Sequence, residues 1–379
     1  MTDSRPSKWL PRPSAHSVAL GAIFLAGLFV RFKGLTFGLP NTMCRPDEAT
    51  IIDAAWNVFN GDPNPHFFYY PSLYIYLLAA IFFLRYAVLL ITGIPNTVLL
   101  SEMTTDPSPF FVISRGVSAL FGAATPIIVY MIMRRVWGRT TALIGAFFTS
   151  LCYLHVRDSH FGTTDVAATF LTLCAVFFTM EAFEKRRTGD YVRAGIFAGA
   201  AAATKYGSIL VVLPMLFAHI CACDQFRTFG SCLRAVVRAP RIWIYSGCVL
   251  LAFLVVMPFA VLDFPTFIAH FRGELTHLAH GHEVGGRPLL LGRGWWYHLR
   301  FTLPDGMGIP MLLFSLAGLV ISLRKSTTRF MMVFLFPIAY YAVSGRGYTV
   351  FVRYMIPVLP FLCMAVSYTH LTLPTKRIV

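Results

Sequence analysis

Long apolar runs separated by short polar segments fill most of the chain. Helices are expected in these runs, because backbone amides without hydrogen-bond partners are too costly in hydrocarbon. The clearest runs approach or reach the roughly 20 residues with which a helix crosses a bilayer, and they read SVALGAIFLAGLFV, FVISRGVSALFGAATPIIVYMIM, VAATFLTLCAVFFTM and IYSGCVLLAFLVVMPFAVL. The pattern predicts an all-α polytopic membrane protein with about ten transmembrane helices.

The composition excludes a single soluble core. Of the 379 residues, 56% are hydrophobic and only 13% are charged, and the mean hydropathy is +0.65. A net charge of +15 would suggest nucleic-acid binding in a soluble protein. Here the Lys and Arg residues lie in short loops between apolar runs, where they orient the chain in a membrane. We therefore expect membrane lipids and no nucleic acid as partners.

The distribution of Lys and Arg predicts the orientation of the chain. We expect the basic segments to face the cytoplasm, and these are the N-terminus and residues 134–139, 184–193, 224–241 and 323–329. The remaining connections then face outward. The two longest form outer loop 1, at about residues 34–109, and outer loop 2, at about residues 263–305.

One apolar run breaks this alternation. Residues 72–94 are long enough to cross, yet the loop that follows them contains no Lys or Arg. If this run crossed, every later basic loop would move to the outside, against the positive-inside rule. We therefore predict that residues 72–92 form an interfacial or re-entrant helix within outer loop 1, with Arg85 reaching the lipid head groups.

The segment at the end of the chain differs from the rest. Residues 367–375, SYTHLTLPT, resemble the translation of a transposon adapter used in sequencing libraries. We expect that residues 367–379 are an artefact and that the natural C-terminus is missing. The predicted organisation is therefore a cytoplasmic N-terminus at residues 1–13, followed by one transmembrane domain at residues 14–366, in the plasma or inner membrane.

The segment CRPDEAT, residues 44–50, places two adjacent carboxylates after the first apolar run. One interpretation is a helix start, with Pro46 in the first turn and with Asp47 and Glu48 favoured there by the helix dipole. The other is that one carboxylate is a general base that removes a proton from an acceptor hydroxyl. A base at a helix N-terminus would be well oriented, so the two interpretations are compatible.

Two cations lie next to apolar runs on the outer side. Lys205 lies between two apolar half-runs in AAAATKYGSILVV, and Arg353 precedes the last one in VRYMIPVLP. Each could extend its charge to the interface, Arg353 beside Tyr354. Alternatively, each faces an anion at membrane depth, for which a phosphate is the natural candidate.

Further outer residues are candidates for binding a substrate or a metal. Asp165 is either an ordinary first-turn acid or a second carboxylate that faces Asp47 across a cavity. The HLAHGHE segment, residues 277–283, lacks the helical HExxH pattern and is either an interfacial loop or a metal site. Trp295 and Trp296 either stack on a sugar or belong to the interfacial aromatic belt. The other candidates are His66, Tyr70, Arg157, Asp158, His160 and His282.

An ordered set of segments resembles the GT-C membrane glycosyltransferases, in particular glycosyltransferase family 39 with the protein O-mannosyltransferases and the aminoarabinose transferases of lipid A. The segments are RPDEATIIDAAWNVFNGD, YYPSLYIYLLA, SRGVSALFGAATPIIVYMIMRRVWGR, DSHFGTTDVAATFL, GAAAATKYG and RYMIPVLPFL. The resemblance covers residues 14–366, and it departs from the family at Pro71, where the family has a proline pair.

The resemblance implies a GT-C fold and an inverting glycosyltransferase. Such an enzyme moves a hexose or pentose from a polyprenyl-phosphate donor to a hydroxyl of a lipid, glycan or protein on the extracytoplasmic face. By position, the resemblance implies that Asp47 is the catalytic base, Glu48 its acidic neighbour and Asp165 a second acidic site. It also implies that Lys205 and Arg353 are the cations that bind the lipid phosphate, with Tyr354 next to Arg353. It leaves open whether a divalent cation assists.

Two other classes of function stay open. A flippase or transporter of lipid-linked sugars would also need buried charges, but would predict inverted repeats or broken helices. A non-catalytic subunit of a cell-envelope polysaccharide assembly would keep the helices without needing Asp47.

Overall fold

The computed structural model describes residues 14–95, 97–222, 236–284, 287–288, 291–325 and 327–372. The predicted cytoplasmic N-terminus, most of the basic loop 224–241 and the end of the adapter-like segment lie outside the described residues. The described chain is almost entirely helical, as predicted, and its one small departure is an antiparallel pair formed by β1 (Glu283–Val284) and β2 (Arg287–Pro288).

Five helices among the described residues are long and apolar enough to cross a membrane, and a bent pair adds a sixth. The five are α1 (Ala15–Phe32), α3 (Leu73–Ile91), α5 (Ser108–Val136), α8 (Thr164–Lys185) and the span Val352–Thr369, which comprises η4 (Val352–Val358) and most of α19 (Leu359–Thr372). The bent pair, Gly294–Met307 and Ile309–Arg324, turns by 116°. The expected count of about ten crossings stays a prediction.

Three apolar helices are shorter than these spans. They are Tyr206–Ala222, made of η2 (Tyr206–Val211) and α10 (Val212–Ala222), together with α12 (Pro240–Val256) and α18 (Thr328–Ser344). The other elements connect and cover the bundle, and they are η1 (Thr42–Cys44), α2 (Pro46–Phe59), α4 (Thr97–Thr105), α6 (Arg139–Leu151), α7 (Tyr153–Asp158), α9 (Thr188–Ala202), α13 (Phe259–Leu262), α14 (Phe264–His280), α15 (Gly294–Tyr297), η3 (His298–Thr302), α16 (Leu303–Met307) and α17 (Ile309–Lys325).

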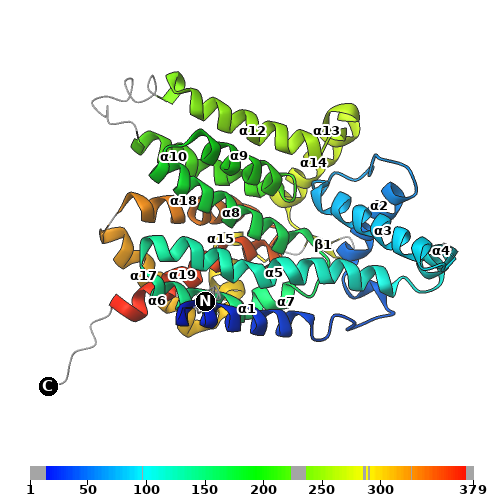
Figure 1. Ribbon diagram of the computed structural model, residues 1–379, viewed down its shortest axis with the longest axis horizontal. Helices are drawn as coiled ribbons and strands as arrows, with labels where there is room; N and C mark the ends of the chain where they lie inside the picture. Colours follow the sequence, from blue (N-terminus) through cyan, green and yellow to red (C-terminus); the bar gives the residue numbers. More distant parts are fainter. Residues whose placement is uncertain are drawn as a thin grey trace, which may run out of the picture.

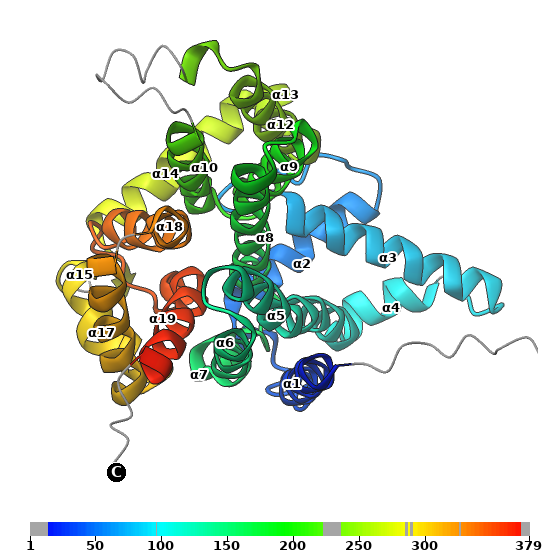
Figure 2. The ribbon, with the colours of Figure 1, turned by 60° about the vertical axis from the view of Figure 1, so that its left-hand side comes forward.

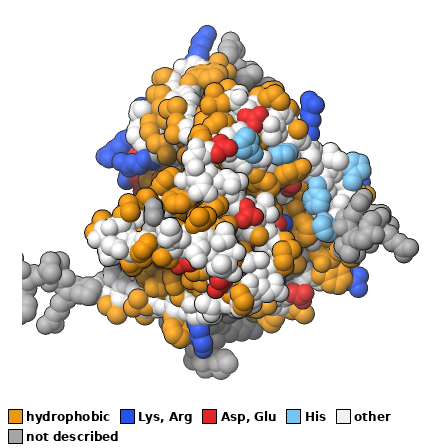
Figure 3. All heavy atoms as spheres, turned by 90° about the vertical axis from the view of Figure 1, so that its right-hand side faces the viewer, with side chains coloured by type: hydrophobic (Ala, Val, Ile, Leu, Met, Phe, Trp, Pro, Cys, Tyr) orange, Lys and Arg blue, Asp and Glu red, His pale blue; other side chains and the backbone are white. Residues whose placement is uncertain are grey.

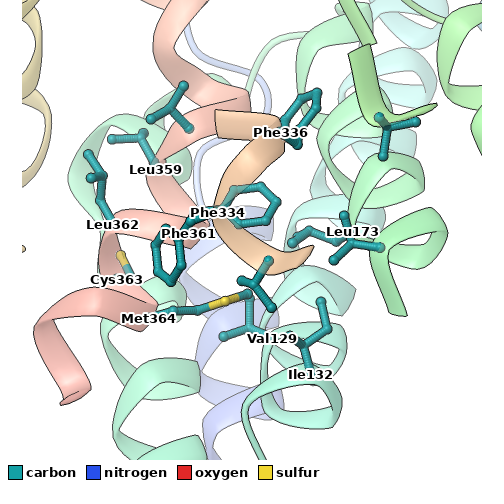
Figure 4. Packing of buried hydrophobic residues seen from close by; sticks show 14 of the residues in the cluster. Val129, Ile132, Leu173, Phe334, Phe336, Leu359, Phe361, Leu362, Cys363 and Met364 are labelled. Carbon is teal, nitrogen blue, oxygen red and sulfur yellow. The ribbon is translucent and has the colours of Figure 1, made fainter. Parts of the chain in front are cut away.

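The helix α8 forms the centre of the bundle. In Figure 2 it lies between α9 and α10 on one side and α5 and α6 on the other, and most of its residues are buried. Figure 4 shows the core beside it, where Leu173 of α8 meets Phe334 and Phe336 of α18 and Phe361 of α19. Close packing of this kind holds membrane helices together, because lipid tails are as apolar as the core itself.

Two glycines bring α9 and α12 into close contact. Gly195 and Gly199 are four residues apart on one face of α9. A Cβ atom on Gly199 would lie 2.3 Å from the carbonyl oxygen of Val249, and one on Gly195 would lie 2.7 Å from that of Tyr245. Only glycine leaves room for this approach, so the spacing fixes how α12 docks on the bundle.

A buried arginine ties α1 to the loop region around α7. The guanidinium of Arg31 is fully buried and donates to the carbonyl oxygens of Gly27 and Ser150 at 3.0 and 2.9 Å. It also lies 3.0 Å from Nδ1 of His155 and 3.2 Å from the hydroxyl of Ser159. These contacts satisfy a charge that would otherwise be costly in the bundle.

The helices α2, α3 and α4 lie together at one end of the bundle (Figure 1). Figure 2 shows α1 nearly end-on and α3 along its length, so α3 runs across the direction of α1. This is the arrangement expected of an interfacial helix, although α3 is also long and apolar enough to span. Arg85 of α3 pairs with Glu102 of α4 at 2.6 Å, so within the described chain its partner is a carboxylate.

Candidate functional site

The two carboxylates of the RPDEA segment face different surroundings. The helix α2 begins at Pro46, and Asp47 and Glu48 occupy its first turn, as expected. Consecutive residues of a helix point about 100° apart. As a result Asp47 lines a cavity, whereas Glu48 is fully buried on the other side of the turn.

Glu48 binds a buried arginine. Arg115 of α5 donates from Nε and Nη2 to the two carboxylate oxygens of Glu48 at 2.9 and 2.8 Å, and the amide of Gly162 donates to the same carboxylate at 2.6 Å. Arg115 also donates to the carbonyl oxygen of Leu35 at 2.7 Å. This fork geometry fixes α2 against α5. These contacts indicate a structural role for Glu48, whose side chain does not line the cavity, while the catalytic role expected for it stays a prediction.

Asp47 is held by a tyrosine and two arginines. The hydroxyl of Tyr70 donates to Oδ1 at 3.0 Å, and Nη1 of Arg353 lies 3.1 Å from Oδ2. Nε of Arg45 lies 3.4 Å from the same oxygen. Burial raises the pKa of Tyr70 well above its usual value, so this phenol stays protonated and keeps donating. Asp47 and Arg353 were predicted from the sequence as two separate site residues, and the structure shows that they form an ion pair.

A second ion pair lies deeper in the same region. Lys205, between α9 and η2, donates to Oδ1 of Asp165 at the start of α8, and both side chains are largely buried. The ammonium of Lys205 also lies 5.1 Å from the centre of the Tyr354 ring, within the range of a cation–π contact. Asp165 and Lys205 thus form one neutral pair.

Two neighbouring cavities adjoin these pairs, and we call the one that Asp47 lines the outer cavity and the one that Lys205 lines the inner cavity. The outer cavity, of about 510 Å³, is lined by Asp47, Thr50, Phe67, Tyr69, Tyr70, Gly273, Glu274, His277, His282, Phe351, Arg353 and Tyr354. The inner cavity, of about 290 Å³, contains Lys205 and is otherwise mostly apolar. Both cavities are lined by Tyr69, Tyr70, Glu274, Arg353 and Tyr354. We call this shared zone the neck.

An apolar groove lies beside the inner cavity. It has a volume of about 490 Å³ and is bordered by residues of α9, η2, α10, α12 and α14. Tyr206, Ile209 and Phe271 line both the groove and the inner cavity. Shared lining residues thus place the three spaces beside one another, with charged residues around the first and apolar residues around the groove. Figure 3 shows the end of the bundle that carries α2 and α3, where acidic and histidine side chains lie among hydrophobic ones.

Four of the expected substrate-binding residues lie outside the cavities. Asp158 is buried and pairs with Arg157 at 2.7 Å, and burial raises its pKa although Arg157 lowers it. The ring nitrogens of His160 lie 2.9 and 3.1 Å from the carbonyl oxygens of Val156 and Lys33. His66 pairs with Asp62 at 3.0 Å and lies 3.9 Å from Asp263, so it links the two outer loops. These contacts fix loops around the site.

The histidine and tryptophan candidates divide between the cavity and the surface. His282 lines the outer cavity beside His277, with ring centres 5.5 Å apart. Trp295 and Trp296 line none of the three spaces described above, and the indole of Trp295 donates to the carbonyl oxygen of Ala342 at 2.9 Å. The predicted stacking of these tryptophans on a sugar is therefore not supported by their position. The described residues contain no group of three or more His, Cys, Asp or Glu placed to bind a metal ion.

Two residues at the site were missed by the sequence reasoning. Arg45 lies beside Asp47 and 4.0 Å from Asp158, and in the sequence only Pro46 separates it from Asp47. Glu274 of α14 lines the neck. Its signal in the sequence is weak, since it is simply the one acidic residue between Asp263 and Glu283.

Comparisons with known proteins concern the fold of the chain. Residues 110–262 match the family described as Dolichyl-phosphate-mannose-protein mannosyltransferase. ArnT from Cupriavidus metallidurans bound to undecaprenyl phosphate matches with a TM-score of 0.65 and 18% identity, over 94% of this chain and 60% of that one. The apo oligosaccharyltransferase from Archaeoglobus fulgidus matches with a TM-score of 0.59 and 13% identity, over 94% and 50%. No curated protein matches the chain.

These matches establish the fold. The chain has the fold of the GT-C membrane glycosyltransferases, and the resemblance noted in the sequence is confirmed at this level. Its apolar helices and this fold make it a membrane protein. The chain spans 60% and 50% of the lengths of the two solved proteins described above.

Proposed function

We propose that this protein is an inverting glycosyltransferase that moves a sugar from a polyprenyl-phosphate donor to an acceptor hydroxyl on the extracytoplasmic face of the plasma or inner membrane. The observation that carries the proposal is the pair of neighbouring cavities with shared lining residues, in which Asp47 and Arg353 adjoin the outer space and Lys205 the inner one. A carboxylate near an acceptor space and cations near a lipid-accessible space are what this reaction needs.

The donor fits the inner cavity and the groove. Its phosphate would bind near Lys205 and Arg353, and its isoprenoid tail would lie in the apolar groove that shares Tyr206 with the inner cavity. The two solved relatives support this choice, since ArnT was solved with undecaprenyl phosphate and the Archaeoglobus fulgidus oligosaccharyltransferase AglB with a dolichol-phosphate and an inhibitory peptide. The acceptor, a lipid, glycan or protein, would enter through the outer cavity.

The reaction is a single displacement at the anomeric carbon. Asp47 removes the proton from the acceptor hydroxyl as its oxygen forms the new bond to that carbon. The bond from the same carbon to the phosphate oxygen breaks, and polyprenyl phosphate leaves with both bonding electrons. Its oxygen gains negative charge as the bond breaks, so a fixed cation such as Arg353 binds it more tightly in the transition state than before.

The test compares Asp47→Asn with the wild type and with a matched control. Purified proteins in lipid receive a panel of radiolabelled polyprenyl-phosphate sugars, and release of free polyprenyl phosphate is measured. Asp53→Asn is the control, because Asp53 lies exposed on the same helix. We expect Asp47→Asn to lower turnover by roughly 100- to 10,000-fold with donor binding intact, while Asp53→Asn retains activity.

Two results would contradict the proposal. Equal release by Asp47→Asn and the wild type would remove Asp47 as the base. Donor binding by the wild type without turnover of any donor would favour a flippase or a non-catalytic subunit of a polysaccharide assembly.

A further inference from the structure

One carboxylate at the neck takes no part in the ion pairs of the site. Glu274 lines both the outer and the inner cavity. Among the described residues, no ion pair or hydrogen bond to its side chain is found, in contrast to Asp47 and Asp165, each of which has a cation within contact distance. Burial raises the pKa of Glu274, against the lowering effect of Lys205 and Arg353. The carboxylate thus lines both cavities without an ion-pair or hydrogen-bond partner among the described residues, so its oxygens are free to accept hydrogen bonds from a ligand.

The backbone next to Glu274 is held in place. A Cβ atom on Gly273 would lie 3.2 Å from the ring of Tyr69, so α14 approaches this tyrosine closely at that point. The ring of Tyr69 also stacks on His270 of the same helix, with centres 4.5 Å apart. Glu274 therefore projects from a helix that is docked against the neck, and a group on a docked helix is well suited to preorganised binding.

The position of the neck identifies what Glu274 would meet. If the phosphate of the donor lies near Lys205 and the anomeric carbon faces Asp47, the sugar ring occupies the neck between them. We propose that Glu274 binds hydroxyl groups of the transferred sugar and thereby determines which donor sugar is accepted. This inference rests on the glycosyltransferase function proposed above. A carboxylate accepts hydrogen bonds from sugar hydroxyls, and a buried acceptor left unpaired disfavours a sugar that lacks them.

The experiment compares Glu274→Ala and Glu274→Gln with the wild type. Arg272→Gln is the matched control, because Arg272 lies exposed on the same helix. We measure kcat and KM for the accepted donor, and separately the binding of that donor and of sugar-free polyprenyl phosphate. We expect Glu274→Ala to weaken donor binding by about 10- to 100-fold, Glu274→Gln to weaken it less, and Arg272→Gln to have no effect. Binding of sugar-free polyprenyl phosphate should not fall in any variant.

Donor analogues that lack single hydroxyls give a second readout. The wild type should discriminate against at least one deoxy analogue, and Glu274→Ala should lose that discrimination. Unchanged discrimination in Glu274→Ala, or an equal loss of affinity for donor and sugar-free lipid, would overturn the inference. Failure of the proposed function is distinguishable from this, because it appears as absent turnover in the wild type, whereas the comparison of the two lipids depends on binding alone.

Discussion

Arg353 and Asp47 form one ion pair, with Nη1 and Oδ2 3.1 Å apart, although they lie near opposite ends of the described chain. The same guanidinium donates from Nη2 to the hydroxyl of Tyr70 at 3.4 Å, and Tyr70 donates to Asp47. The proposed base and a proposed phosphate ligand are therefore bonded to each other before a substrate binds. We expect the donor phosphate to compete for Arg353, which would release Asp47 to act as a stronger base.

The Arg353→Lys variant tests whether the planar guanidinium of Arg353, and not only its charge, is needed for turnover. Lysine retains the charge, but it lacks the planar fork with which Arg353 contacts Asp47 and Tyr70 together. We expect kcat to fall by on the order of 100-fold, since the preorganised donor geometry at the leaving group is lost although the charge remains. Steady-state kinetics with varied donor would measure this, with Arg346→Lys as the control at an exposed position. Equal kcat values for the two variants would contradict the role of the fork.

The pair formed by Lys205 and Asp165 should also support the fold. Lys205→Met leaves the buried carboxylate of Asp165 without its cation. Removing one partner of a buried ion pair costs about 3 to 5 kcal/mol, so we expect a clear loss of thermal stability in lipid or detergent. Adding Asp165→Leu should recover much of that loss, because the unpaired charge is then gone. A double variant as unstable as Lys205→Met alone would argue against the pair.

Glu48 and Asp47 should respond differently to the same chemical change. Glu48→Gln weakens a fully buried fork to Arg115, so its main effect should be on stability. We expect a lower unfolding temperature, with turnover per folded molecule within a few-fold of the wild type. Asp47→Asn should show the reverse, near-normal stability and lost turnover. Parallel thermal unfolding and activity measurements would check both. Turnover per folded molecule that fell as far in Glu48→Gln as in Asp47→Asn would support the catalytic role predicted for Glu48 from the sequence.

Glu274 should make stability depend on pH. Burial raises its pKa in the folded state, so the ionised form is disfavoured there and the folded state is destabilised once the pH exceeds the unfolded value of about 4.3. Below that pH the carboxyl is protonated in both states and no cost arises. We therefore expect Glu274→Gln to be more thermally stable than the wild type near pH 7, with the difference shrinking toward pH 4. A difference independent of pH would indicate a packing effect instead.

Most of the helical architecture could be predicted from the sequence, because membrane helices follow from long apolar runs. The helix start at Pro46, with Asp47 and Glu48 in its first turn, and the fold implied by the ordered segments are examples. The charged candidates Lys205, Arg353 and Asp165 were found because charges near apolar runs are costly and therefore conspicuous.

The partners of these residues could not be predicted, since they depend on how helices pack. Glu48 and Asp47 are neighbours in the chain, and only the docking of α5 against α2 shows that Arg115 forms an ion pair with Glu48. His160, Trp295 and Trp296 are of residue types that often line sugar sites. In the structure, however, His160 and Trp295 contact backbone carbonyl oxygens, and Trp296 is exposed at the protein surface. Glu274 gave almost no signal, because a single glutamate on a polar helix is common.

The sequence by itself thus determined that this is a helical membrane protein, where its charged outer segments lie along the chain, and which family it resembles. These properties follow from local hydrophobicity and from short patterns. The tertiary structure decided which carboxylate faces the cavity, which cation each carboxylate binds, and which residues the polar cavity, the inner cavity and the apolar groove share. These properties arise from contacts between segments far apart in sequence, and such contacts exist only once the helices are packed.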